Sequence, residues 1–174
     1  MSVARFHVDA AIPRDRPGTL LELPENVATH ALRVLRLGAG DRIVLFDGHG
    51  GEHAAAIVAA GRHGATARLL EFDPIERESP APSALVMSVI AADPMDFAVR
   101  KAVELGVGTV LPVVAARSQG AIAGERADRR LAHWRAVAIA ACEQCGRNRI
   151  PPVAAPVRLA TWFASHVVTV SEAC

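Results

Sequence analysis

Polar side chains suited to acid–base or anion chemistry gather in residues 142–149. Glu143 and Gln144 stand between two cysteines, and Gly146 and Arg147 follow directly. Glycine is a common residue just after a helix, so this group is expected where a long helix stops and a loop begins. Loops at such places carry ligand-binding groups in α/β proteins. The stretch is therefore a candidate ligand-binding site.

Cys142 and Cys145 form a Cys-x-x-Cys pair, a spacing that occurs in zinc sites and in thiol redox motifs. Zinc needs two further ligands, and the sequence has no second Cys pair. A redox pair is favoured at a helix N-terminus, whereas this pair is expected at a helix C-terminus, where the dipole disfavours a thiolate. We therefore expect no bound metal. A metal or redox protein is a weaker hypothesis than the two functions considered at the end of this subsection.

His30, Arg33 and Arg36 place nitrogen-rich side chains at intervals of three residues along an expected helix. Residues three apart share one side of a helix, so these groups could hold phosphates together. Val34 and Leu35 are expected to anchor the other side. Such triplets are more often a solvated helix face, and spacing alone does not decide between the two interpretations.

A second basic group, Arg100 and Lys101, precedes Glu104 at helical spacing. Lys101 is the one lysine of the chain. It either lies near an anionic ligand or forms an exposed ion pair with Glu104, which would contribute little.

His49 and His53 flank a Gly-Gly dipeptide. On a helix this spacing could bind a metal, but the glycines predict a hairpin turn, so both histidines are expected to face solvent. The glycines lack the Lys-Ser/Thr of a phosphate loop, so no such loop is predicted.

The first seventy or so residues predict the β-rich part that carries His30, Arg33 and Arg36. Short strands separated by glycine turns suggest a small β-barrel. Strands are expected at residues 3–8, 19–23, 42–46, 52–59 and 66–72, with a helix at 25–35.

Residues 73–83 contain three prolines and are expected to be a linker. After them strands and helices alternate, which predicts a parallel sheet with crossover helices. The strands are expected at 84–91, 109–114 and 167–170, and the helices at 94–105, 126–145 and 159–165. The predicted fold class is α/β with an N-terminal β-barrel, in domains 1–72 and 84–174.

The chain has 174 residues, of which 51% are hydrophobic and 21% charged, a composition that excludes a disordered chain. The odd number of cysteines, and the lack of a secretion signal or membrane-spanning run, predict a soluble cytoplasmic protein. The net charge is +1, but residues 117–149 hold seven arginines against three acidic residues. Arginine favours phosphate, so RNA is a candidate partner, although a solvated arginine-rich helix face is the simpler interpretation.

Several ordered stretches resemble the bacterial ribosomal RNA small-subunit methyltransferase E family. They are His30 to Gly38, Leu45 to Gly48, Met95 to Val107, Arg117-Ser118 and, most specific, Ala138 to Pro151. Enzymes of that family methylate N3 of a uridine in 16S ribosomal RNA with S-adenosylmethionine as the cofactor. The resemblance therefore implies a methyltransferase whose partner is 16S rRNA in the small ribosomal subunit.

The resemblance also implies a PUA-like RNA-binding barrel at 1–72 and a SPOUT domain, an α/β fold with a trefoil knot that is usually dimeric. We expect a homodimer through that domain and no membrane partner. On this basis Glu143 is the candidate base for the N3 proton, and Arg147 the group that stabilises the uracil anion. The residues expected to contact RNA are Arg5, His30, Arg33, Arg36, Lys101, Glu104, Arg117 and Gln144.

The sequence departs from the family pattern in two places. Residues 92–94 stand where the family commonly has a glycine and a basic residue, and the family's Gly-Pro-Glu-Gly-Gly cofactor loop is absent from the 174 residues. We therefore expect an incomplete SPOUT domain that stops before the knot, cofactor-binding residues beyond Cys174 and no activity of this chain by itself. The alternative is an RNA-binding module without catalysis.

Overall fold

The computed structural model describes residues 3–61, 64–116 and 124–165. The chain divides into two compact units, of which the first comprises residues 1–78 and 142–150 and the second residues 79–141 and 151–174. Nine residues distant in the sequence thus belong with the N-terminal unit. In the described ranges no helix has both the length and the hydropathy needed to cross a membrane.

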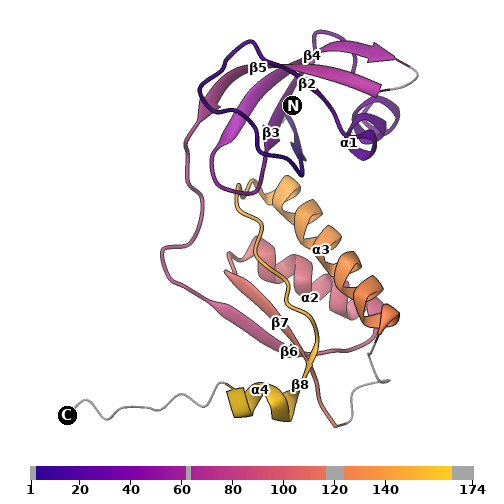
Figure 1. Ribbon diagram of the computed structural model, residues 1–174, viewed down its shortest axis with the longest axis vertical. Coiled ribbons are helices and arrows are strands. Elements are labelled where there is room, and N and C mark those ends of the chain that lie inside the picture. The colour runs from indigo at the N-terminus through magenta and orange to yellow at the C-terminus, as the bar shows by residue number, and fades with distance from the viewer. Residues whose placement is uncertain (1–2, 62–63, 117–123, 166–174) are drawn as a thin grey trace, which may run out of the picture. The chain divides into compact units, whose positions relative to one another are not determined.

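The first unit is built on a five-stranded sheet with the order β1-β3-β4-β5-β2 (Figure 1). Its strands are β1 (Ala4–His7), β2 (Leu20–Glu22), β3 (Arg42–Phe46), β4 (Glu52–Gly61) and β5 (Gly64–Asp73). β1 runs parallel to β3, and all other neighbours are antiparallel. Among the described residues the edge strands β1 and β2 do not pair with each other, so the closed barrel expected from the sequence is not confirmed.

Alternation along the two longest strands explains the core of this unit. In β4 the side chains of His53, Ala55 and Ile57 are buried, while intervening residues are more exposed. Strand side chains point to opposite faces in turn, so this period of two directs one face inward. The core formed on that face also includes Phe6, Val8, Ile12, Leu23, Val27, Ala28, Ala31, Ile43, Leu45, Ala65, Ala67 and Leu69.

The helix expected at 25–35 is α1 (Glu25–Thr29) continued by η1 (His30–Val34), a turn of π-helix. The expectation that Val34 and Leu35 anchor it is wrong, because these side chains are 65% and 43% exposed while Ala31 is fully buried. The Leu35 N–H donates to the His30 carbonyl five residues earlier, at 3.0 Å. A π-turn adds a residue to the turn, which shifts the following side chains off the buried face.

The second unit contains three parallel strands in the order β6-β7-β8. The alternation in sequence predicts the first two of them, but not β8. They are β6 (Ala84–Ser88), β7 (Thr109–Val114) and β8 (Val157–Arg158), and α4 (Leu159–Ser165) follows. The strand expected at 167–170 lies outside the described residues, as does the segment in which the knot is expected.

Helix α2 (Ala92–Glu104) connects β6 to β7 and buries Met95, Val99 and Val103, one residue per turn. It ends at Gly106, which has a φ of +89°. There the Val107 N–H donates to the Ala102 carbonyl at 3.0 Å, the bond of a glycine-terminated helix.

Helix α3 (Glu125–Cys145) is the long helix expected near the C-terminal half. It buries Trp134 and Ala138, and His133 Nε2 lies 2.7 Å from Asp96 Oδ2 of α2. Gly146, with a φ of +89°, ends the helix, as its sequence position predicts.

The turn between β3 and β4 corrects one expectation. His49 is exposed, but His53 is only 4% exposed and does not face solvent as expected. The turn of the hairpin ends before His53, so this residue lies within β4. Its side chain points to the same face of the strand as the buried Ala55 and Ile57. Its ring packs against Phe72, with 4.9 Å between ring centroids.

Gly51 is the position in this turn at which a side chain is least tolerated. Its φ is +71°, and a Cβ there would overlap the Phe72 ring and lie 2.9 Å from the Asp73 carbonyl oxygen. We expect Gly51→Ala to lower the free energy of unfolding by about 3 kcal/mol, from left-handed strain plus overpacking.

Gly18→Ala is the matched control for Gly51→Ala. Its φ is +85°, but a Cβ there meets nothing within 4 Å, so about 1 kcal/mol of backbone strain is expected. Urea unfolding followed by circular dichroism measures both variants. Equal losses would contradict the clash with Phe72.

Candidate functional site

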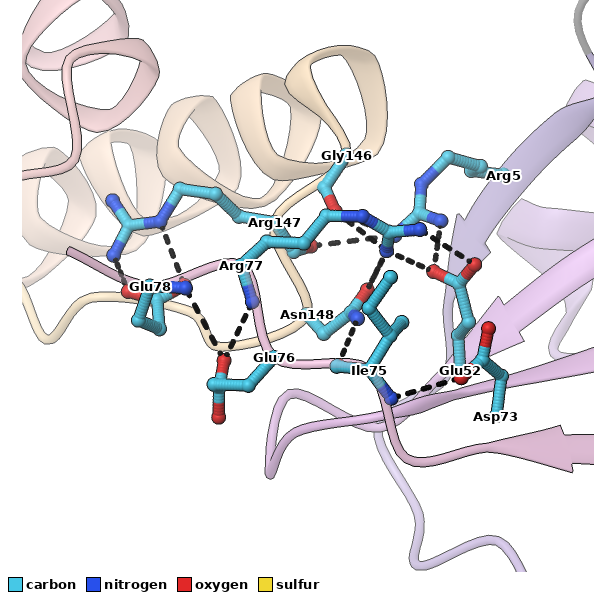
Figure 2. A network of polar contacts seen from close by, with 10 residues as sticks. All are labelled: Arg5, Glu52, Asp73, Ile75, Glu76, Arg77, Glu78, Gly146, Arg147 and Asn148. Carbon is cyan, nitrogen blue, oxygen red and sulfur yellow. Dashed lines mark hydrogen bonds and ion pairs between the residues drawn. The ribbon is translucent and has the colours of Figure 1, made fainter. Parts of the chain in front are cut away.

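A network of ion pairs in the first unit centres on the carboxylate of Glu52 (Figure 2). Glu52 begins β4, and its side chain is 12% exposed. Arg5 of β1 donates from Nη1 to Oε2, and Arg77 donates from Nη1 to Oε2 at 2.6 Å and from Nη2 to Oε1 at 3.1 Å. One carboxylate therefore joins β1, β4 and the segment that follows β5.

The same two arginines bind the loop that follows α3. Arg5 Nη2 donates to Asn148 Oδ1 at 2.7 Å and to the Gly146 carbonyl at 3.2 Å. Arg77 Nη1 donates to these two acceptors at 3.3 and 3.2 Å. Asn148 is fully buried, and its Nδ2 donates to the Ile75 carbonyl at 3.1 Å. The loop is thus held by side chains from other segments.

Arg147 makes a two-point ion pair with Glu78, in which Nε donates to Oε1 at 2.9 Å and Nη2 to Oε2. Arg147 is only 5% exposed. Burial lowers its pKa, but the hydrogen bonds and charge of Glu78 outweigh burial, so the pKa lies above the ordinary value. By contrast, the pair of Arg149 Nε with Glu76 Oε2, at 2.6 Å, lies on the surface.

Electrostatics explain why Glu52 stays charged although little exposed. Burial alone would raise its pKa, but hydrogen bonds from Arg77 and Arg5, and their charges, bring the pKa below the ordinary value of 4.5. Paired and hydrogen-bonded charges are the form in which buried ions are tolerated.

The polar group between the cysteines lies at the end of α3. Glu143 is half-buried, and its Oε1 accepts the backbone N–H of His7 at 2.9 Å. Gln144 is exposed. Cys142 and Cys145 are free thiols, and burial raises the pKa of Cys142 to about 12, so that thiol is not ionised at neutral pH. Within the described ranges no group of three or more His, Cys, Asp or Glu side chains could hold a metal ion.

Of the residues predicted from the sequence, Arg5, Glu143 and Arg147 come together in the first unit through this network and the loop after α3. Lys101 and Glu104 belong to the second unit and pair with each other, with 2.6 Å between Nζ and Oε2.

The basic group on η1 and just after it is exposed. His30, Arg33 and Arg36 make no ion pair with any described residue, and Arg36 has a left-handed φ of +58°. His30 packs edge-on against Phe6, with 5.7 Å between ring centroids. Arg117 lies outside the described residues.

Sequence reasoning missed Glu52, Arg77, Glu78 and Asn148. Two of them stand in the segment expected to be a linker, where charge alternates as Glu-Arg-Glu. The alternating charges of residues 76–78 and the arginines of the 147–149 loop were the available signal for these ion pairs. Nothing in one sequence shows, however, that the two segments meet.

Comparison with known proteins shows to which family the chain belongs. A family model for an RNA methyltransferase PUA domain matches residues 23–70, and one for an RNA methyltransferase domain matches residues 77–171. Ribosomal RNA small subunit methyltransferase E of Mycobacterium bovis is 36% identical over 124 residues, which cover 71% of this chain and 47% of that protein. The chain belongs to the ribosomal RNA small subunit methyltransferase E family.

Further relatives agree with this assignment. The methyltransferase E of Synechocystis is 31% identical over 81% of this chain and 46% of its own length. A crystal structure of methyltransferase E from Neisseria gonorrhoeae, bound to S-adenosyl methionine, is 39% identical with a TM-score of 0.84, over 90% of this chain and 63% of that one. The chain spans about half the length of the curated relatives it matches.

In this methyltransferase E family member the Glu52 network joins segments of both family domains. Arg77, Glu78 and the 146–149 loop fall within the RNA methyltransferase domain match, whereas Glu52 lies in the PUA domain match. All of them belong to the first compact unit. The network therefore fixes this part of the methyltransferase segment against the N-terminal sheet.

We expect Glu52→Gln to lower the free energy of unfolding by about 3 kcal/mol, because it leaves the little-exposed Arg5 guanidinium, and the more exposed one of Arg77, without a counter-charge. Glu76→Gln removes one carboxylate of the exposed pair and should change stability by less than about 0.5 kcal/mol. Urea unfolding of both variants checks this, and equal effects would contradict a central role for Glu52.

The pH dependence of the same variant gives a second readout. The folded-state pKa of Glu52 is below its ordinary value of 4.5, so its contribution is complete above pH 4.5 and is lost as pH falls below that value. Unfolding free energy should thus fall more steeply below pH 4.5 in the natural chain than in Glu52→Gln.

Proposed function

We propose that the protein methylates N3 of a uridine in 16S ribosomal RNA of the small subunit, with S-adenosylmethionine as methyl donor. One observation carries this proposal: the RNA methyltransferase domain match over residues 77–171. The similarity to the Neisseria gonorrhoeae enzyme bound to S-adenosyl methionine supports the choice of donor.

The described residues do not by themselves fit the cofactor. The candidate cavity in the second unit has a volume of about 190 Å³ and is lined by apolar side chains, with Thr161, Ser165 and Trp162 as the polar ones. Pockets for ligands of this size are commonly 300 to 1,000 Å³, roughly. The lining also holds no charged group that could bind the amino-acid part of the cofactor. This cavity is therefore not assigned to the cofactor.

The chemistry at uracil requires removal of the N3 proton, which a carboxylate can accept. We propose Glu143 for this role. One of its oxygens is held by the His7 N–H, and within the described part of the chain its second oxygen has no hydrogen-bond donor. Arg147 is proposed to stabilise the uracil anion, but two of its donors already bind Glu78. Arg147 would therefore stabilise the uracil anion through the positive charge of its guanidinium, which stays paired with Glu78.

RNA contacts are proposed for Arg5, His30, Arg33, Arg36, Lys101, Glu104, Arg117 and Gln144. The exposed basic group of η1 is the best supported, because a cavity of about 380 Å³ is lined by Arg33 together with Glu25 and Thr29. Arg5 is the least available, since its guanidinium already binds Glu52 and the 146–148 loop.

The wider architecture follows from the family. We propose a PUA-like RNA-binding barrel at 1–72, a connection at 73–83 and a SPOUT domain from residue 84. We further propose a homodimer through that domain and a cytoplasmic location. The second candidate function, RNA binding without catalysis, is favoured by the small apolar cavity of the second unit.

Methyl transfer tests the proposed function. The protein is incubated with methyl-labelled S-adenosylmethionine and either 16S rRNA or small subunits, and the RNA is digested to nucleosides. We expect labelled N3-methyluridine when the cofactor-binding residues proposed beyond Cys174 are present, and none from residues 1–174 alone. RNA binding without this product would contradict the proposal and favour the binding module.

Arg33→Ala and Arg36→Ala should each weaken binding of 16S rRNA and lower the slope of log affinity against log salt by about 1, because each removes one phosphate contact. Arg68→Ala, an exposed arginine of β5, is the charge-matched control. Filter binding over a salt series measures all three, and an unchanged slope in both test variants would exclude these residues from the RNA interface.

A further inference from the structure

A cavity of about 250 Å³ in the first unit has no role in the function proposed above. It lies where β4 and β5 meet residues 13–17, and we name it the His53 pocket. Its polar and aromatic lining consists of Arg14, Arg16, His53, Glu71 and Phe72. The pocket combines two cations, a buried imidazole and an aromatic ring.

The imidazole of His53 is the observation that points to a ligand. His53 is 96% buried, since only 4% of the residue is exposed, and it lines the pocket. Its ring forms no hydrogen bond with any group in the described ranges, and it packs against the apolar Phe72 ring. Neither ring nitrogen is fully enclosed by the protein, so a molecule in the pocket can reach the imidazole and supply the hydrogen-bond partner that a largely buried polar side chain usually has.

The two arginines make the pocket attractive to an anion. The Arg14 guanidinium lies over the Phe72 ring at 5.1 Å and donates from Nη2 to the Gly50 carbonyl at 3.3 Å, which holds it in place with further donors unused. Neither Arg14 nor Arg16 forms an ion pair with a described residue. Glu71 is the one carboxylate of the lining, so the positive charge is in excess.

The protonation state of His53 determines which groups of a ligand its imidazole can bind. Burial lowers its pKa below the ordinary value of 6.5; the Asp47 charge offsets part of this by raising the pKa, and the Arg14 charge adds a smaller lowering. A neutral imidazole has one donor and one acceptor, which suits a ribose hydroxyl or a base edge better than a phosphate. Guanidinium forks suit the phosphate.

We propose that the His53 pocket binds one nucleotide of single-stranded RNA, with the phosphate at Arg14 and Arg16 and the ribose or base at His53. This inference rests on the proposed function, because RNA is the substrate there. The pocket volume is of the order of a single nucleotide. Single-stranded segments are the form in which a protein can reach an individual base, so the site would hold RNA next to the target.

Binding is tested with three probes: a hexauridylate strand, uridine 5′-monophosphate and inorganic phosphate. The protein is labelled at its histidine rings, and the His53 signals are assigned with His53→Gln. We expect hexauridylate and uridine monophosphate to shift the His53 ring signals, the strand at lower concentration. Inorganic phosphate should leave these signals in place.

Arg16→Ala provides the variant test, because Arg16 is exposed and its loss should not disturb the fold. We expect about tenfold weaker binding of hexauridylate, the effect of removing hydrogen bonds to a charged group. Arg42→Ala, an exposed arginine of β3 outside the pocket, is the control and should leave hexauridylate binding unchanged.

Three results would overturn the proposal. These are His53 signals that no probe shifts, shifts of equal size with inorganic phosphate, and equal losses in Arg16→Ala and Arg42→Ala. Labelled N3-methyluridine without any His53 shift would reject the pocket and keep the proposed function. His53 shifts without N3-methyluridine would keep the pocket and reject the proposed function.

Discussion

The first unit depends on one carboxylate that is largely withdrawn from water. Glu52 accepts hydrogen bonds from Arg5 and Arg77, and both arginines continue to the loop after α3. A loop of this kind has few hydrogen bonds of its own, so its conformation depends on external partners. Because charged partners enclosed together stabilise each other only as a complete set, the segments of the network order one another.

This arrangement changes how the residues near the end of α3 are understood. Arg147 looks from its position like a free cation beside a candidate site, yet it is buried and paired with Glu78. Glu143, in the last turn of α3, has one oxygen held by the β1 backbone and, among the described residues, no donor at the other. Glu143 and Arg147, which lies in the loop that follows, therefore differ in their partners although they are close in sequence.

The first unit has two kinds of basic surface. The group of His30, Arg33 and Arg36, on η1 and just after it, is exposed and has no ion pairs among the described residues, a setting in which contacts to phosphates would be screened and adaptable. The His53 pocket instead combines cations with a buried imidazole and an aromatic ring. Both lie in the unit that contains the PUA domain match, in agreement with the RNA methyltransferase family to which the chain belongs.

The sequence by itself determined what depends on local periodicity and on turn residues. The helices that end at Gly106 and Gly146, the hairpin at the Gly50-Gly51 turn and the parallel strands β6 and β7 all follow from such signals. The family followed from the ordered motifs.

Contacts between distant segments were decided only by the tertiary structure. The sequence shows neither that Arg5 and Arg77 meet at Glu52, nor that His53 turns inward, nor that a π-turn exposes Val34. The physical reason is that burial and pairing depend on which segments meet in space, whereas spacing along one chain reports only the geometry of a single helix or strand.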